Sequence, residues 1–185
     1  MFNTTDRFGL VAIGLHWIVA LTIFGLFGLG WYMVDLSYYD RLYNTLPAIH
    51  KSIGILLMFV FVFWVFWRMI NLAPKPVEST SRFEVIAAKL VHLVLSGLIA
   101  LILVSGYLIP TAEGVSISVF GWFEVPATIT SIPEQEDITG LIHKYLAYVI
   151  IALALLHAGA ALKHQFINKD DTLKRMLGRV SYKSK

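Results

Sequence analysis

Four long apolar stretches, separated by polar segments, make up most of the sequence. Charged residues are absent from 10–34, 52–67, 90–110 and 145–162. A helix crosses the roughly 30 Å hydrocarbon core of a bilayer with about 20 apolar residues. The first and third stretches reach that length alone, and the other two reach it once the adjoining His-Lys turn is included. The pattern predicts an all-α, four-helix transmembrane bundle with helices at about 10–34, 48–70, 84–110 and 138–164.

The composition also indicates a membrane protein. Hydrophobic residues make up 57% of the 185 residues and charged residues only 15%. A soluble domain carries roughly a quarter charged residues. We therefore expect one integral-membrane domain spanning residues 1–185, with lipid as its immediate environment.

The basic residues are distributed unevenly between the two sides of the predicted bundle. One side carries Arg7, four basic residues between the second and third helices, and seven in the C-terminal tail. The other side carries only Arg41, Lys51 and Lys144, and its longest segment, 111–137, holds five acidic residues and no basic one. By the positive-inside rule we predict that both termini are cytoplasmic. The basic flanks face anionic lipid, and they give no reason to expect a nucleic-acid partner.

The links between the helices carry weaker signals. Ser81 and Glu84 form an S-x-x-E capping box, which is predicted to start the third helix. The mildly aromatic segment 111–137 is expected to fold as a lid on the outer end of the bundle or to anchor at the membrane interface. After the fourth helix, Asp170 and Asp171 are predicted to cap a short basic helix on the cytoplasmic surface.

Histidines are the candidate cofactor ligands, because the chain has no cysteine. That absence excludes disulfides, thiolate-bound iron–sulfur clusters and covalently attached c-type haem. Four of the six histidines fall at two depths. His16 and His157 lie six residues from the cytoplasmic ends of their helices, about 9 Å deep. His50 and His143 begin helices on the opposite side, each within an Ile-His-Lys triplet. We call the first pair the inner layer and the second pair the outer layer.

The spacing of His143 and His157 places them on one face of the fourth helix. They are 14 residues apart. In an α-helix that spacing turns through about 1400°, about 40° short of four full turns, and rises about 21 Å. One bundle interior can therefore hold both side chains, one near each membrane boundary.

Two imidazoles per layer, from separate helices in an apolar slot, favour haem over zinc. Zinc takes four protein ligands, or three and a water molecule, and few carboxylates are available here. Haem supplies four equatorial nitrogens itself and needs only axial ligands. Haem also needs close backbone approach, which glycines near the histidines can provide: Gly14, Gly54 and Gly159.

The four histidines therefore predict two haem b groups. The predicted axial ligands are His16 with His157 in the inner layer and His50 with His143 in the outer layer. Basic residues at matching levels could pair with haem propionates, although lysines at an interface need no such role: Arg68 and Lys89 inside, Lys51 and Lys144 outside. The alternative interpretation of an intramembrane histidine is a hydrogen-bonding strut or a member of a proton path.

His92 and His164 are surplus to the four predicted ligands. Both fall near the inner membrane interface, where they can be ordinary polar residues. The alternative is a quinone pocket beside the inner haem, in which a headgroup oxygen needs a hydrogen-bond partner. Lys89 lies at the same level and belongs to that candidate site.

Four segments of the chain resemble the bacterial cytochrome b561 family, which comprises four-helix di-haem membrane cytochromes. They are GLHWIVA, IHKSIGILLM, VHLVLSGLIALILVSGYLI and LHAGAALKHQFINKDDTLKRML. The resemblance covers nearly the whole chain and implies axial ligands from the first, second and fourth helices. It also implies a bacterial inner-membrane location and electron exchange with the quinone pool. One branch of the family is linked to superoxide oxidation at the outer face.

The sequence thus predicts a di-haem b-type cytochrome that carries electrons across the inner membrane and exchanges them with ubiquinone or ubiquinol. No catalytic residue is predicted. One alternative is an enzyme, a superoxide oxidase that passes electrons from periplasmic superoxide to ubiquinone. A periplasmic redox protein is another possible outer partner. Further alternatives are a cytochrome b subunit of a larger dehydrogenase or hydrogenase complex, and a haem-free proton or solute carrier.

Overall fold

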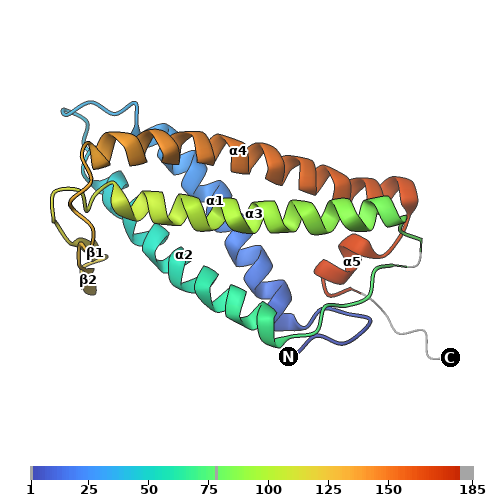
Figure 1. The fold of residues 1–185 in the computed structure, drawn as a ribbon. Helices are drawn as coiled ribbons and strands as arrows, with labels where there is room; N and C mark the ends of the chain where they lie inside the picture. The colour runs from blue at the N-terminus through green and yellow to red at the C-terminus, as the bar shows by residue number, and fades with distance from the viewer. Residues whose placement is uncertain (1, 78, 180–185) are drawn as a thin grey trace.

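The computed structural model describes residues 2–77 and 79–179. Its long helices are α1 (Leu10–Met33), α2 (Thr45–Ile70), α3 (Arg82–Leu108) and α4 (Gln135–Lys163) (Figure 1). Every predicted helix is confirmed, and every boundary falls within three residues of its predicted position. Each of the four is long and apolar enough to cross a membrane. Two lysines of the predicted basic tail, Lys183 and Lys185, lie outside the described residues, and the single domain over 1–185 stays a prediction.

The helices pack as two antiparallel pairs. α1 packs mainly against α2, and α3 mainly against α4, whereas α1 and α4 touch each other little. One end of the bundle carries β1 (Ile117–Val119) and β2 (Phe123–Val125), and we call it the hairpin end (Figure 1). The opposite end carries the π-helical turn His164–Asn168 and α5 (Thr172–Met176), and we call it the α5 end.

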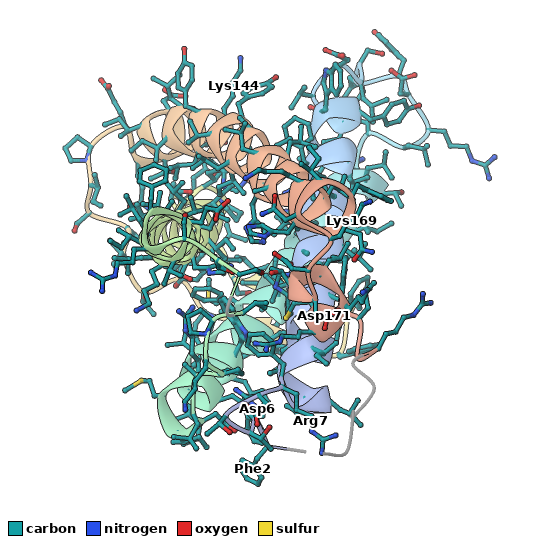
Figure 2. All side chains as sticks on the ribbon, turned by 90° about the vertical axis from the view of Figure 1, so that its right-hand side faces the viewer. Phe2, Asp6, Arg7, Lys144, Lys169 and Asp171 are labelled. Atoms are coloured by element: carbon teal, nitrogen blue, oxygen red, sulfur yellow. The ribbon has the colours of Figure 1, made fainter. Side chains whose placement is uncertain are left out.

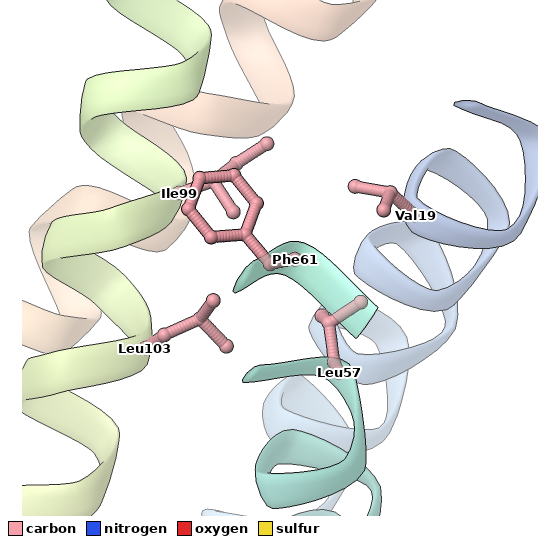
Figure 3. Close-up of a cluster of buried hydrophobic side chains, with 5 residues drawn as sticks. All are labelled: Val19, Leu57, Phe61, Ile99 and Leu103. Carbon is pink, nitrogen blue, oxygen red and sulfur yellow. The ribbon is translucent and has the colours of Figure 1, made fainter. Parts of the chain in front are cut away.

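A small apolar core joins α1, α2 and α3 at mid-depth. Its buried members are Val19, Leu57, Phe61, Ile99 and Leu103 (Figure 3). Large apolar side chains elsewhere on the helices are exposed, among them Leu21, Phe59 and Leu156. Helices in a bilayer gain little from removing apolar surface from lipid, so van der Waals packing holds such a core together. The exposed apolar residues form a surface suited to lipid.

The segment between α3 and α4 folds as a β-hairpin that packs on α2. β1 and β2 pair antiparallel, and the turn residues Phe120 and Gly121 have φ values of 50° and 72°. Two consecutive positive φ values match the right-handed twist of a tight hairpin. Val119 is fully buried, while Phe120 and Trp122 are exposed. The segment thus contains a folded hairpin, and both its position on the outer side and its anchoring at the membrane interface stay predictions.

The predicted capping box at the start of α3 is present. The Ser81 side chain accepts a hydrogen bond from the backbone N–H of Glu84, and the Glu84 carboxylate accepts one from the backbone N–H of Ser81. Glu84 also pairs with Lys163, with Nζ and Oε1 2.7 Å apart. The start of α3 is therefore tied to the end of α4.

The short helix α5 folds back against α1. Trp17 Nε1 donates a hydrogen bond to the backbone oxygen of Met176 at 2.8 Å. The predicted helix is confirmed, but its predicted capping is only half right. Asp171 occupies the N-cap position without a side-chain cap bond, because its carboxylate instead accepts from Lys174 Nζ. Asp170 accepts the backbone N–H of Thr172.

Candidate functional site: two layers of paired histidines

The four predicted ligand histidines meet as two facing pairs. In the inner layer, the ring centres of His16 on α1 and His157 on α4 are 6.3 Å apart, with planes inclined at 62°. In the outer layer, the ring centres of His50 on α2 and His143 on α4 are 6.2 Å apart, with planes inclined at 70°. The two separations agree within 0.1 Å although α4 faces α1 in one pair and α2 in the other.

These separations fit a metal ion shared by two imidazoles. A metal–imidazole bond is about 2 Å long and the ring centre lies about 1.1 Å from its nitrogen, so two in-line ligands have centres about 6 Å apart. Within the described residues, no group of three or more His, Cys, Asp or Glu side chains is arranged to hold a metal ion. A haem iron asks for only two axial side chains, so the pairs fit this cofactor.

His92 on α3 also reaches the inner layer. Its ring centre lies 4.9 Å from that of His157, with planes inclined at 66°. That separation is too short for the two rings to ligate one iron from opposite sides. His92 therefore packs beside His157, and the geometry favours His16 as the opposite ligand.

Hydrogen bonds fix the ring of His143. Its Nδ1 lies 3.1 Å from the backbone oxygen of Ile102 and 3.2 Å from Oγ of Ser105, both on α3. A carbonyl oxygen only accepts, so Nδ1 carries the proton and Nε2 is left as the unprotonated nitrogen. A ligating histidine typically donates its other N–H to such an acceptor, which sets both tautomer and orientation.

Two glycines lie against the imidazole rings of the outer histidines. A Cβ at Gly106 on α3 would lie 2.9 Å from Cε1 of His143, and a Cβ at Gly30 on α1 would lie 3.3 Å from Cε1 of His50. Nδ1 of His50 is buried without a hydrogen-bond partner in the described part of the protein. Close packing against Gly30 restricts the ring of His50, which lacks the hydrogen bonds that orient His143.

Sequence reasoning missed Gly30, Gly106 and Ser105. A signal for both glycines exists in the spacing, because Gly30 follows His16 by 14 residues and Gly106 follows His92 by 14 residues. The same spacing that aligns His143 with His157 places each glycine on the histidine-bearing face of its helix, in the outer layer. The side chains that would meet Gly106 could not be foreseen without the pairing of α3 with α4.

The three glycines singled out from the sequence lie beside open space. A Cβ added at Gly14, Gly54 or Gly159 would meet nothing within 4 Å. That result is compatible with a groove for a cofactor, although no protein side chain in the described residues approaches these three. Their role as haem-contacting residues stays a prediction.

The predicted propionate partners are all at the surface. Arg68, Lys51, Lys89 and Lys144 are exposed. The ion pairs of the described residues, Lys163–Glu84, His164–Asp170 and Lys174–Asp171, include none of them. Within the described residues, Lys89 makes no hydrogen bond or ion pair with His92 or His164, so these four assignments stay predictions.

His164 forms a buried pair with Asp170 where α4 ends. Its Nδ1 lies 2.6 Å from Oδ2 of Asp170, and the two side chains are 12% and 4% exposed. Lys169 and Asp171, the chain neighbours of Asp170, lie where α4 turns back toward α5 (Figure 2). Burial raises the pKa of Asp170, but hydrogen bonds from Thr172 and His164 outweigh it and bring the pKa below its usual value. Asp170 is therefore a carboxylate.

A four-helix membrane bundle with facing histidine pairs defines the class of membrane-bound b-type cytochromes. The comparisons with known proteins agree. The family model described as prokaryotic cytochrome b561 matches residues 7–179. The chain belongs to the prokaryotic cytochrome b561 family.

Three curated relatives span nearly the whole chain. Cytochrome b561 homolog 2 of Escherichia coli K12 is 50% identical over 97% of this chain and 95% of its own length. Cytochrome b561 homolog 1 of the same organism is 32% identical, covering 94% of this chain and 98% of its own length. Probable superoxide oxidase CybB of Yersinia pestis is 27% identical, covering 92% of this chain and 96% of its own length. Membership of the family makes this chain a multi-pass, haem b-binding electron-transfer protein.

Proposed function

We propose that this protein carries electrons across a bacterial inner membrane through two b-type haems. His16 and His157 would hold one haem, and His50 and His143 the other. The observation that carries the proposal is the pair of equal ring separations, 6.3 Å and 6.2 Å, at two levels of one bundle. A single histidine serving as a polar strut has no reason to face another ring at that distance.

The haem iron, when bound, supplies reversible one-electron chemistry. The residues of the chain orient the imidazoles, leave space for them and exclude water. Ile102 and Ser105 orient His143, Gly30 and Gly106 give the outer rings room to seat, and the apolar helices exclude water from both layers. These features set which imidazole nitrogen is available as a ligand, the tautomer of the ring and the local polarity. A protein adjusts the reduction potential of a haem through such features.

The distribution of charge supports the proposed orientation. The α5 end is basic, whereas the hairpin end carries the acidic residues of 111–137 and few cations. By the positive-inside rule the α5 end would face the cytoplasm and the hairpin end the periplasm. Electrons would then pass between an outer redox partner and an inner one.

Ubiquinone is the proposed inner partner, with His164 at its site. His164 follows His157 by seven residues, a spacing that turns through about 700° and rises about 10 Å. It therefore faces the same way as His157, between the inner layer and the α5 end. His92 beside His157 is the second candidate contact, and exposed Lys89 is the third.

The first test is a visible spectrum with haem quantitation. Protein purified in detergent should show a reducible b-type α-band, contain two haems per chain, and be reduced by ubiquinol without any other subunit. Protein without a reducible band would eliminate the electron-transfer proposal in favour of a haem-free carrier. Reduction by ubiquinol only in the presence of a larger complex would favour the role of a cytochrome b subunit.

A superoxide oxidase is the second candidate function. The relative from Yersinia pestis is named a probable superoxide oxidase, and Lys51 and Lys144 are exposed beside the outer histidines. Two exposed cations near the outer histidines attract an anion such as superoxide and raise its association rate. This increase in rate becomes smaller as the salt concentration rises. Superoxide generated outside vesicles that contain the protein and ubiquinone should then reduce the quinone.

Charge-neutral variants test this second candidate. Lys51→Gln with Lys144→Gln should slow the superoxide reaction several-fold at low salt and flatten its salt dependence, while ubiquinol-driven reduction stays unchanged. Arg7→Gln is the matched control, because it removes a cation from the opposite end. A superoxide rate that is indifferent to both the lysines and the salt concentration would exclude the attraction, and no reaction at all would exclude the activity.

A further inference from the structure

The hydrogen bonds of Asp170 show which ring nitrogen of His164 carries a hydrogen. The Asp170 carboxylate accepts on both oxygens, with Oδ2 2.6 Å from Nδ1 of His164 and Oδ1 accepting the backbone N–H of Thr172 at 2.9 Å. Its side chain is only 4% exposed. A carboxylate can only accept, so Nδ1 of His164 carries a hydrogen.

The end of α4 is shaped to make this contact. The last helical residues widen into the π-helical turn His164–Asn168, and Lys169 takes a left-handed conformation with φ 57°. The chain then turns back, so that the backbone N–H of Asp170 donates to the backbone oxygen of His164 at 3.1 Å. Such turns occur at the C-termini of helices, and here the turn brings Asp170 back to His164.

One competing contact exists at the same nitrogen. Nδ2 of Asn168 lies 3.2 Å from Nδ1 of His164. Asn168 is exposed, and its amide is neutral and farther away. A hydrogen bond to a carboxylate is shorter and roughly twice as strong as a neutral one, so Asp170 decides which nitrogen is protonated.

We propose that Asp170 is a positioning residue that fixes the tautomer of His164, so that Nε2 accepts a hydrogen bond from the hydroxyl of a quinol. The inference rests on the proposed quinone site at His164. A quinol headgroup presents hydroxyl donors, whereas the oxidised quinone presents only carbonyl acceptors. An accepting Nε2 therefore favours the reduced headgroup. Asp170 thus gives the site its preference between the two redox forms.

The test compares the binding of two short-chain ubiquinone analogues, decylubiquinol and decylubiquinone, to the purified holoprotein. In Asp170→Asn, the asparagine amide can donate to Nδ1, which moves the ring hydrogen to Nε2. The ratio of quinol affinity to quinone affinity should then fall about tenfold, the effect of one hydrogen bond gained or lost. Asp171→Asn is the matched control, because within the described residues the Asp171 carboxylate pairs only with Lys174, at the surface.

The ratio of quinol affinity to quinone affinity distinguishes a role of Asp170 in positioning His164 from a purely structural role. If Asp170 merely holds the tail of α4 in place, Asp170→Asn weakens both analogues alike and leaves the ratio unchanged, which overturns the inference. His164→Gln distinguishes the failure of the underlying site. Unchanged binding of both analogues in His164→Gln would reject the quinone site itself. Weakened binding in His164→Gln, with an unchanged ratio in Asp170→Asn, would leave the site standing and reject the role of Asp170.

Discussion

A methyl group added at Gly106 would lie 2.9 Å from Cε1 of His143, closer than such atoms approach in proteins. In Gly106→Ala the imidazole must therefore move, away from the hydrogen bond to Ile102. We predict that Gly106→Ala lowers the haem content from two per chain toward one, measured on the purified protein. Alanine itself favours a helix over glycine by about 1 kcal/mol, so a loss of haem cannot come from the helix.

Gly97→Ala is the control for this substitution. Gly97 lies on the same helix, and a Cβ there would meet nothing within 4 Å. Gly97→Ala should keep both haems. If Gly106→Ala also kept both, with an unchanged spectrum, the ring of His143 would not be seated as described.

The Asp170 carboxylate makes one contribution to stability dependent on pH. Its pKa lies below the usual value, because hydrogen bonds from Thr172 and His164 outweigh the effect of burial. A lowered pKa stabilises the fold fully above the unfolded value of about 4, and the contribution disappears as the pH falls through the lower folded value. The unfolding midpoint of the wild type should therefore approach that of Asp170→Asn as the pH falls below about 4.

Other acidic groups titrate in both proteins, so the difference between the two midpoints isolates Asp170. A difference that stays constant from neutral pH to acid would contradict a stabilising carboxylate at this position.

At the scale of elements, the hairpin depends on one serine of α2. Oγ of Ser52 accepts the backbone N–H of Phe120 at 3.1 Å and donates to the backbone oxygen of Ala48 at 2.8 Å. The side chain of Ser52 is buried with a relative exposure of 2%. Ser52→Ala leaves a donor of the hairpin turn without its partner, which costs about 1–3 kcal/mol where the group is buried.

We predict that Ser52→Ala speeds amide exchange in β1 and β2, measured by hydrogen–deuterium exchange with mass spectrometry. Ser96→Ala is a matched control, because in the part of the chain that the structure describes Oγ of Ser96 bonds only to the backbone oxygen of His92, within its own helix. Ser96→Ala should leave hairpin exchange unchanged. Equal exchange in wild type and Ser52→Ala would show that the hairpin is held by Val119 and its apolar neighbours alone.

The helices were predictable because a long charge-free stretch in a bilayer must satisfy its backbone polar groups within the segment, which an α-helix does. The facing of the histidine pairs was predictable for a related reason, since depth and helical phase both follow from residue number, whereas their role as haem ligands stays a prediction. Ser105 and Gly106 were not, because their roles arise where α3 packs on α4. The contact between His164 and Asp170 also depends on a π-turn that apolar periodicity does not reveal.

At the scale of the whole molecule, the two layers are built by different pairs of helices. α1 and α4 supply the inner histidines, and α2 and α4 the outer ones, so α4 contributes to both. α1 and α4 touch each other little, so the inner histidines connect two helices that otherwise make few contacts. A cofactor there would join the two halves of the bundle, and its loss should loosen their association.

The pairing of ligands is the central claim, and haem content in double variants tests it most directly. His16→Ala with His157→Ala removes two predicted ligands from one layer and should leave one haem per chain, as either single variant should. His16→Ala with His50→Ala removes one ligand from each layer and should leave none. His92→Ala should keep both haems, because its ring lies only 4.9 Å from that of His157 and cannot share its iron. One haem remaining in the cross-layer variant, or none in the same-layer variant, would contradict the account.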